Sequence, residues 1–211
     1  MPETQLATEG LAFERDDRPL FQNLDLNLTA GQLLQIEGAN GCGKTTLLKL
    51  LCGLLTPSAG TIRWRGSDIR DDVASFHAEL AYVGHIPAVK EELSPFENVA
   101  FAQALATPRV GVTPVAALAR VRLPARCLEM PCRQLSAGQR RRVALARLLA
   151  TEAPLWILDE PFTALDPAGR ELVEQLLAEH AANGGIAILT THHPMAISAG
   201  EVRHLQLGAA A

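Results

Sequence analysis

Residues 38–45 read Gly-Ala-Asn-Gly-Cys-Gly-Lys-Thr and stand between a short apolar run and a stretch of helix-forming residues. This spacing of glycines before a Lys-Thr pair is typical of a phosphate-binding loop that joins a strand to a helix. The glycines allow the backbone to curl so that successive N–H groups face one anion, and the helix N-terminus adds a positive field. The pattern predicts a strand over residues 33–37, a helix over 45–51 and a nucleotide phosphate between them, rather than a plain glycine-rich turn.

The side chains of this loop have separate expected roles. Lys44 is placed to pair with the β- and γ-phosphates, and the hydroxyl of Thr45 is placed to coordinate Mg²⁺. The expected cofactors are therefore a nucleoside triphosphate and Mg²⁺. The expected nucleotide-binding residues of the loop are Gly38, Ala39, Asn40, Gly41, Cys42, Gly43, Lys44, Thr45 and Thr46.

A second apolar run, residues 155–158, ends in Asp159 and Glu160. An apolar run followed by two acids is by itself a common strand end that meets solvent. Combined with a phosphate-binding loop it indicates nucleotide hydrolysis, with Asp159 near the metal and Glu160 able to polarise the attacking water.

Strand and helix patterns alternate along the chain. A third strand candidate, residues 186–190, follows a helical stretch over 167–182 that is closed by Asn-Gly-Gly. Such alternation predicts an α/β fold with a largely parallel sheet. Between residues 86 and 150 the alanine-rich stretches 97–106 and 113–121 predict a helical insert. The turn-rich region 11–21 and residues 61–65 would supply a small antiparallel sheet.

Composition limits the possible partners. The chain has 19 Lys and Arg against 23 Asp and Glu, so its formal net charge of -4 argues against nucleic acid as a partner. The N-terminal residues do not match a secretory signal, and no apolar stretch approaches the roughly 20 residues of a membrane span. Four cysteines fit neither a zinc pattern nor a disulfide framework, which predicts reduced thiols and a cytoplasmic protein whose contact with a membrane depends on a partner.

Residues 135–139, Leu-Ser-Ala-Gly-Gln, resemble the LSGGQ signature of ABC ATPases with one glycine replaced by alanine. The motif precedes an expected helix over 139–150, whose N-terminus would attract an anion. In the ABC family this motif contacts the γ-phosphate held by the opposite subunit, which assigns nucleotide contacts to Ser136, Gly138 and Gln139. Because the chain carries one copy of each motif, the resemblance implies an ATP-dependent homodimer.

The resemblance covers about residues 11–207 and implies the fold of a P-loop NTPase of the ABC type. That fold has a RecA-like parallel-sheet core, a small antiparallel β subdomain and an inserted helical subdomain. We expect one domain over 1–211, in which 1–85 and 151–211 form the catalytic core with the β subdomain. Residues 86–150 would form the helical subdomain with the signature motif.

Further roles are implied by the same resemblance. Residues 164–166 resemble the D-loop at the dimer interface, and His192 the switch histidine that senses the γ-phosphate, so Lys44, Glu160 and His192 are the expected catalytic residues. Phe13 is either the aromatic that stacks on adenine or a core residue. The family's glutamine before the helical subdomain is replaced, because His85 or Ile86 stands in its place. The arginines at 140–142 and 147 resemble those that commonly follow the signature. We expect them on a solvated face with subunit contacts rather than at a nucleic-acid site.

At a finer level, residues 53–66, 132–139 and 154–166 resemble the ATP-binding subunits of cytochrome c maturation systems, the so-called haem exporters. This implies a peripheral subunit on the cytoplasmic face of the inner membrane, bound to an integral membrane permease and driving haem delivery. An ATPase for another exporter, of lipid, drug or lipoprotein, is the alternative. A soluble ABC ATPase acting on nucleic acid would carry two cassettes or a long coiled coil. A nucleotide-gated module without turnover would not need Glu160 and His192.

Overall fold

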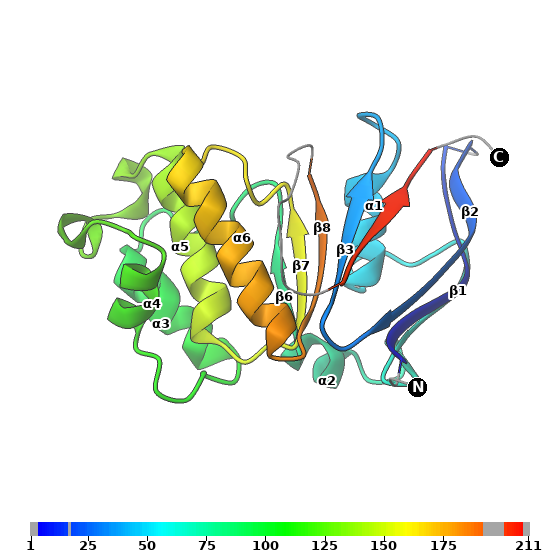
Figure 1. Ribbon diagram of the computed structural model, residues 1–211, viewed down its shortest axis with the longest axis horizontal. Coiled ribbons are helices and arrows are strands. Elements are labelled where there is room, and N and C mark those ends of the chain that lie inside the picture. Colours follow the sequence, from blue (N-terminus) through cyan, green and yellow to red (C-terminus); the bar gives the residue numbers. More distant parts are fainter. Residues whose placement is uncertain (1–3, 17, 192–200, 209–211) are drawn as a thin grey trace.

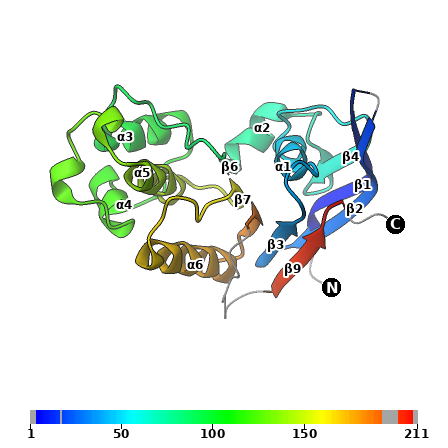
Figure 2. The ribbon, with the colours of Figure 1, turned by 90° about the horizontal axis from the view of Figure 1, so that it is seen from above.

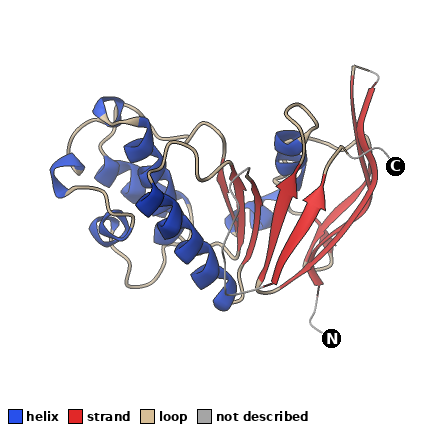
Figure 3. Ribbon diagram, turned by 45° about the horizontal axis from the view of Figure 1, so that its top comes forward, coloured by secondary structure: helices blue, strands red, loops and turns tan. Residues whose placement is uncertain are grey.

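The computed structural model describes residues 4–16, 18–191 and 201–208. Two sheets lie at one side of the molecule and most of the helices lie at the other (Figures 1 and 3). The α/β fold predicted from the sequence is confirmed, with a parallel sheet, an antiparallel sheet and the two helices expected between residues 86 and 150.

The parallel sheet has the strand order β6-β7-β8-β3-β9. All of its neighbouring strands pair in parallel. Its strands β7 and β8 are buried along their full length, which is why both read as continuous apolar runs. The bounds are β3 (Gln32–Glu37), β6 (Leu80–Val83), β7 (Leu155–Asp159), β8 (Ile186–Thr190) and β9 (Glu201–Gln206).

The antiparallel sheet has the order β2-β1-β4-β5. The small antiparallel sheet expected from residues 11–21 and 61–65 is confirmed, but its first two strands, of twelve residues each, extend well beyond the short runs that the sequence indicated. Register shifts interrupt their pairing, so neither strand has the regular alternation that marks a strand in sequence. The bounds are β1 (Thr4–Arg15), β2 (Arg18–Thr29), β4 (Ala59–Trp64) and β5 (Ser67–Asp68).

The helices lie on different sides of the parallel sheet. Helix α1 lies between the two sheets, whereas α6 lies on the opposite face of the parallel sheet (Figure 2). Helices α3, α4 and α5 pack together on the side away from the antiparallel sheet. The bounds are α1 (Lys44–Leu51), α2 (Val73–Ala78), α3 (Pro95–Leu105), α4 (Pro114–Arg120), α5 (Ala137–Ala150) and α6 (Pro167–Ala182). Two short 3₁₀ turns, Ala125–Cys127 and Cys132–Gln134, connect α4 to α5.

Strand β7 separates two hydrophobic cores. Its residues Leu155 and Ile157 pack in the core around α1, while Trp156 and Leu158 pack in the core that α5 and α6 share. This division follows from the alternation of side chains across a strand. None of the helices formed by the described residues is long and apolar enough to cross a membrane.

Candidate nucleotide-binding site

The phosphate-binding loop follows β3 and leads directly into α1, as its sequence predicts. Gly38 has a positive φ of 148°, and a Cβ at this position would lie 2.5 Å from the carbonyl oxygen of Leu207, so only glycine fits. The Nζ of Lys44 donates hydrogen bonds of 2.6 and 3.2 Å to the carbonyl oxygens of Gly38 and Ala39. The ammonium group therefore lies across the loop, within reach of an anion bound to the loop's N–H groups.

Asp159, the last residue of β7, is hydrogen-bonded to both α1 and β8. Its carboxylate accepts a hydrogen bond of 2.8 Å from the hydroxyl of Thr45 on α1 and one of 2.7 Å from the hydroxyl of Thr190 on β8. Its side chain is almost completely buried. Because the carboxyl ends of parallel strands meet at one edge of the sheet, the two predicted metal-binding residues, Thr45 and Asp159, lie in direct contact.

Glu160 stands where the chain turns out of the sheet. Its φ of 51° lies in the left-handed region, which non-glycine residues adopt rarely and mostly at turns and functional sites. Its backbone N–H donates to the carbonyl oxygen and the hydroxyl of Thr190, at 3.2 and 3.0 Å. The end of β8 thus fixes the backbone of Glu160 beside Asp159.

These residues border a cavity of about 700 Å³ at the carboxyl ends of the parallel strands. Six of the nine predicted nucleotide-binding residues of the loop line it, together with His85, whereas Ile86 is 82% exposed outside it. Gly38, Ala39 and Cys42 belong to the loop without lining the cavity. The lining residues are Arg15, Leu20, Asn40, Gly41, Gly43, Lys44, Thr45, Thr46, Lys49, Leu55, His85, Asp159, Glu160 and Thr163.

Two cations in this lining were not predicted from the sequence. Lys49 stands four residues after Thr45 on α1, so the helical period could have placed it on the same face. Arg15, at the end of β1, has a weak 3.4 Å hydrogen bond to the hydroxyl of Thr46. The position of Arg15 in the cavity depends on how the antiparallel sheet packs over α1, and the local sequence does not indicate this packing. With Lys44, the cavity has three cations suited to a polyphosphate.

The antiparallel sheet contributes Arg15 and Leu20 to the cavity but not Phe13. Phe13 is opposite Phe21 in the β1–β2 pair, and both rings pack half-buried against the core around α1. Of the two interpretations of Phe13, this position favours the core residue. His192 lies outside the described residues.

The signature motif lies apart from this cavity, at the start of α5. Ser136 is the N-cap: its hydroxyl accepts a 3.2 Å hydrogen bond from the N–H of Gln139, whose side chain accepts one of 2.8 Å from the N–H of Ser136. This reciprocal pair stabilises the first turn of the helix. Ser136, Gly138 and Gln139 do not line the cavity beside the phosphate-binding loop of their own chain.

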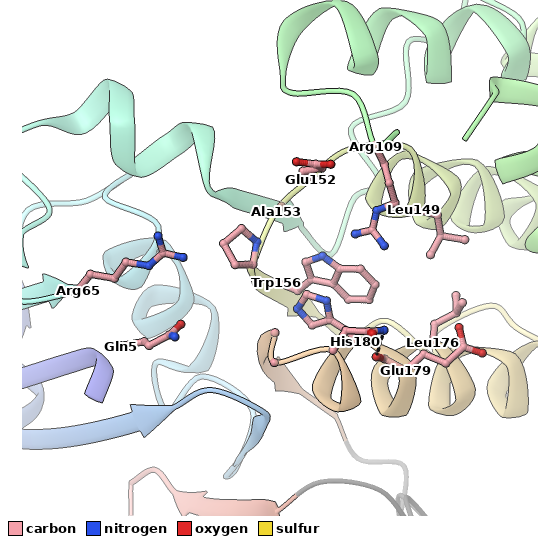
Figure 4. Close-up of a pocket in the computed structure, with 14 residues that line it drawn as sticks. Gln5, Arg65, Arg109, Leu149, Glu152, Ala153, Trp156, Leu176, Glu179 and His180 are labelled. Atoms are coloured by element: carbon pink, nitrogen blue, oxygen red, sulfur yellow. Dashed lines mark hydrogen bonds between the residues drawn. The ribbon is translucent and has the colours of Figure 1, made fainter. Parts of the chain in front are cut away.

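A second cavity, of about 360 Å³, lies at the other end of β7 (Figure 4). There the rings of Trp156 and His180 stack 3.9 Å apart, and burial lowers the pKa of His180 to about 4. Arg109, Glu152 and Glu179 stand around this pair. The cavity contains none of the predicted site residues.

A glycine-rich loop whose threonine contacts a buried Asp–Glu strand end, on a parallel sheet, defines a P-loop nucleotide-binding domain. A family model described as ABC transporter matches residues 21–163. The chain belongs to this family, and with that membership it is an ATPase of the ABC type.

Two relatives carry the name Cytochrome c biogenesis ATP-binding export protein CcmA. The protein from Methylococcus capsulatus is 50% identical over 208 residues, which cover 98% of this chain and 100% of that protein. The one from Nitrosococcus oceani is 51% identical over 205 residues, 97% of this chain and 93% of that protein. Among solved structures, a dimeric post-hydrolysis state of the ATP-binding cassette MJ0796 bound to ADP and Pi aligns with a TM-score of 0.82 at 23% identity, covering 96% of each chain, and so supports the fold.

Proposed function

We propose that this chain is the ATP-hydrolysing subunit of an ABC export complex in cytochrome c biogenesis, and that the step it drives is haem delivery. The observation that carries the ATPase is the contact of Thr45 with Asp159 beside Glu160 in one large cavity. The observation that carries the pathway is the near-complete alignment with CcmA proteins at about half identity. The complex would place the chain at the cytoplasmic face of the inner membrane, against an integral membrane permease.

The nucleotide phosphates would bind to the N–H groups of residues 38–46. Lys44 would exchange its bonds to Gly38 and Ala39 for the β- and γ-phosphates, since a charged acceptor is stronger than a carbonyl oxygen. Arg15 and Lys49 add positive charge at the rim of the same cavity. The adenosine would lie beside Leu20 and Arg15, with Phe13 supporting the sheet behind them.

The paired oxygens of Thr45 and Asp159 fit Mg²⁺, which prefers hard oxygen ligands and binds few protein groups beside the phosphates. The bond between the two would open so that both oxygens face the ion, while Thr190 continues to hold Asp159. Mg²⁺ bound there would neutralise charge on the β- and γ-phosphates.

Hydrolysis requires a water in line with the γ-phosphate. Glu160 lines the cavity next to Asp159 and would orient this water and accept its proton. His192, two residues beyond β8, would contact the γ-phosphate and assist Glu160. His85, rather than the exposed Ile86, would take the place of the family's glutamine at the γ-phosphate end.

The separation of the signature motif from the cavity supports a homodimer. The N-terminal end of α5 carries exposed Ser136 and Ala137, and its N–H groups would bind the γ-phosphate held by a second copy. Two chains related by a twofold axis would then enclose two ATP molecules, and each site would be complete only in the dimer.

The permease would bind beside the segment 85–101 that leads from β6 into α3. Exposed apolar side chains occur in this segment and along α3: Ile86 is 82%, Phe101 41% and Leu105 72% exposed. A groove of about 170 Å³ between β6 and α3 has a largely apolar lining that includes Leu105. An apolar surface of this kind suits a partner segment with apolar side chains.

The test uses cells depleted of their own cytochrome c maturation ATPase and complemented with the wild-type chain or with Glu160→Gln. We expect wild type alone to restore c-type cytochromes and the purified wild type to hydrolyse ATP. The Glu160→Gln chain should bind ATP, form a stable dimer and hydrolyse it about 100-fold or more slowly. Hydrolysis without rescue would instead support an exporter of another cargo, and absence of hydrolysis would refute the ATPase mechanism.

A further inference from the structure

Arg141 is a buried arginine on α5, five residues after the N-cap of that helix. Its side chain is only 2% exposed, although arginine is rarely buried without a partner for its charge. Within the described residues no carboxylate lies within salt-bridge distance of it. Instead, its guanidinium donates hydrogen bonds of 3.0 and 2.8 Å to two consecutive carbonyl oxygens, those of Gly84 and His85.

These two carbonyl groups belong to the loop that follows β6 and bends at His85 and Ile86. His85 lines the nucleotide cavity, so the bonds connect that cavity to the helix that begins at the signature motif. A planar guanidinium can donate in two fixed directions at once, which a lysine ammonium does less rigidly. The pair of bonds therefore sets the orientation of the backbone that carries His85.

The charge of Arg141 also interacts with carboxylates of the nucleotide site. Burial lowers the pKa of its guanidinium, while the carboxylates of Asp159 and Glu160 oppose that shift by attraction. Arg147, on the same helix, is bonded to the carbonyl oxygen of Ala88 in the same loop, and burial lowers the pKa of its guanidinium.

We propose that Arg141 is a positioning residue of the ATPase reaction, which acts through His85 by fixing the loop 84–85 to α5. A movement of α5, such as its approach to a nucleotide on a second copy, then moves His85 relative to Glu160 in its own cavity. The inference rests on the proposed function, because it assigns a role to His85 at the γ-phosphate end. It adds a residue that links the signature helix of a chain to the nucleotide pocket of the same chain.

The first measurement compares Arg141→Met, Arg141→Lys and the matched control Arg147→Gln. For Arg141→Met we expect kcat for ATP to fall about 10- to 100-fold with KM within about threefold of wild type, because a misplaced group costs turnover rather than phosphate binding. Arg141→Lys should recover only part of kcat, and Arg147→Gln should stay within about threefold of wild type. A kcat for Arg141→Met near that of wild type would overturn the proposal, as would equal losses in Arg141→Met and Arg147→Gln.

The second measurement asks whether Arg141 acts through His85, in a double-mutant cycle with His85→Ala. If it does, the double variant should be no more than about threefold slower than the slower single variant, whereas multiplied losses would refute the connection. Hydrogen exchange provides a readout without turnover: Arg141→Met should speed exchange of the amides in 84–88 at unchanged melting temperature. Unchanged exchange in Arg141→Met would overturn the proposal for Arg141, whether or not the wild-type chain hydrolyses ATP. Absence of ATP hydrolysis by the wild-type chain would instead refute the proposed function.

Discussion

Gly138 lies directly against the carbonyl oxygen of Ala164, so closely that a Cβ at residue 138 would come within 2.6 Å of that oxygen. Ala164 itself has a left-handed φ of 64° in the loop that leads from Glu160 to α6. The signature helix and this loop therefore touch through a glycine. The contact explains why alanine occurs at exposed residue 137 of the signature while glycine occupies 138.

Gly138→Ala should impair the dimer without impairing the nucleotide pocket of the single chain. The added methyl group displaces either the start of α5 or the backbone at Ala164, and with it the N–H groups proposed to contact the second nucleotide. We expect ATPase activity to fall about 100-fold, as when one donor to a developing charge is lost, with ATP affinity of the monomer retained. Sedimentation with ATP in the Glu160→Gln background measures the dimer.

Ala137→Gly is the control for this variant, because residue 137 is exposed in the same helical turn. It should leave both activity and dimer formation within about threefold of wild type, since its main cost is about 1 kcal/mol of helix propensity. Full activity in Gly138→Ala would show that the start of α5 does not serve the second nucleotide.

A second prediction concerns the hydroxyl of Thr45, which bonds to Asp159 at 2.8 Å. Thr45→Val keeps the shape of the side chain but removes the proposed oxygen ligand, so Mg²⁺-dependent hydrolysis should fall about 100-fold. Thr45→Ser restores the hydroxyl and should retain most of the activity. Titration of Mg²⁺ at saturating ATP separates the two variants, and equal Mg²⁺ dependence in both would contradict a metal role for Thr45.

The sequence predicted those parts of the fold that short patterns determine. Helix α6 occupies the range expected for it, 167–182, because a proline begins it and Asn183 with two glycines ends it. Strands β3, β7 and β8 were found from their continuous apolar runs. In contrast, β6 and β9 are edge strands with several exposed or half-buried positions, and only their pairing with β7 and β3 makes them strands.

The site was predictable where its residues belong to recognisable motifs, and less so where a residue outside any motif is brought in by packing. Lys44, Thr45, Asp159 and Glu160 come together because loops at the carboxyl ends of parallel strands converge. Arg141 was interpreted from the sequence as part of a solvated basic face, yet it is buried. The sequence holds no sign of this, because the acceptors are backbone carbonyl groups about 56 residues away.

A third prediction uses Cys42, the half-buried thiol of the phosphate-binding loop. The other three cysteines are at most 3% exposed, and burial raises the pKa of Cys52 and of Cys132, the latter to about 11. Since the thiolate is the reactive form, N-ethylmaleimide should modify Cys42 first and abolish ATP binding by its bulk. ATP should slow the modification more than about tenfold, and Cys42→Ala should resist inactivation. Mass spectrometry identifies the labelled residue; labelling of Cys42 at the same rate with and without ATP would place its thiol outside the nucleotide's contact.

The final prediction concerns His180, which stacks on Trp156 at the opposite end of β7 from Asp159. The residue is 8% exposed, and one ring nitrogen lies 3.2 Å from the carbonyl oxygen of Ile186. Burial lowers the pKa of His180 from 6.5 to about 4, and the nearby positive charge of Arg109 acts in the same direction. The folded protein therefore holds this histidine neutral at pH values where the unfolded chain binds a proton.

Because the unfolded state takes up the proton first, the free energy of unfolding should fall as the pH drops from about 6.5 to about 4. Above pH 6.5 the contribution of His180 to the free energy of unfolding should not change with pH. The size of the pKa shift corresponds to a loss of about 3 kcal/mol in the free energy of unfolding between these two pH values. His180→Gln keeps a donor toward Ile186 but does not titrate, so its unfolding free energy at pH 7 should be lower by about 1 kcal/mol for the lost stacking. Urea denaturation at pH 4.5 and 7 compares the two chains: the wild type should lose more stability than His180→Gln, and parallel losses would mean that other groups carry the acid sensitivity.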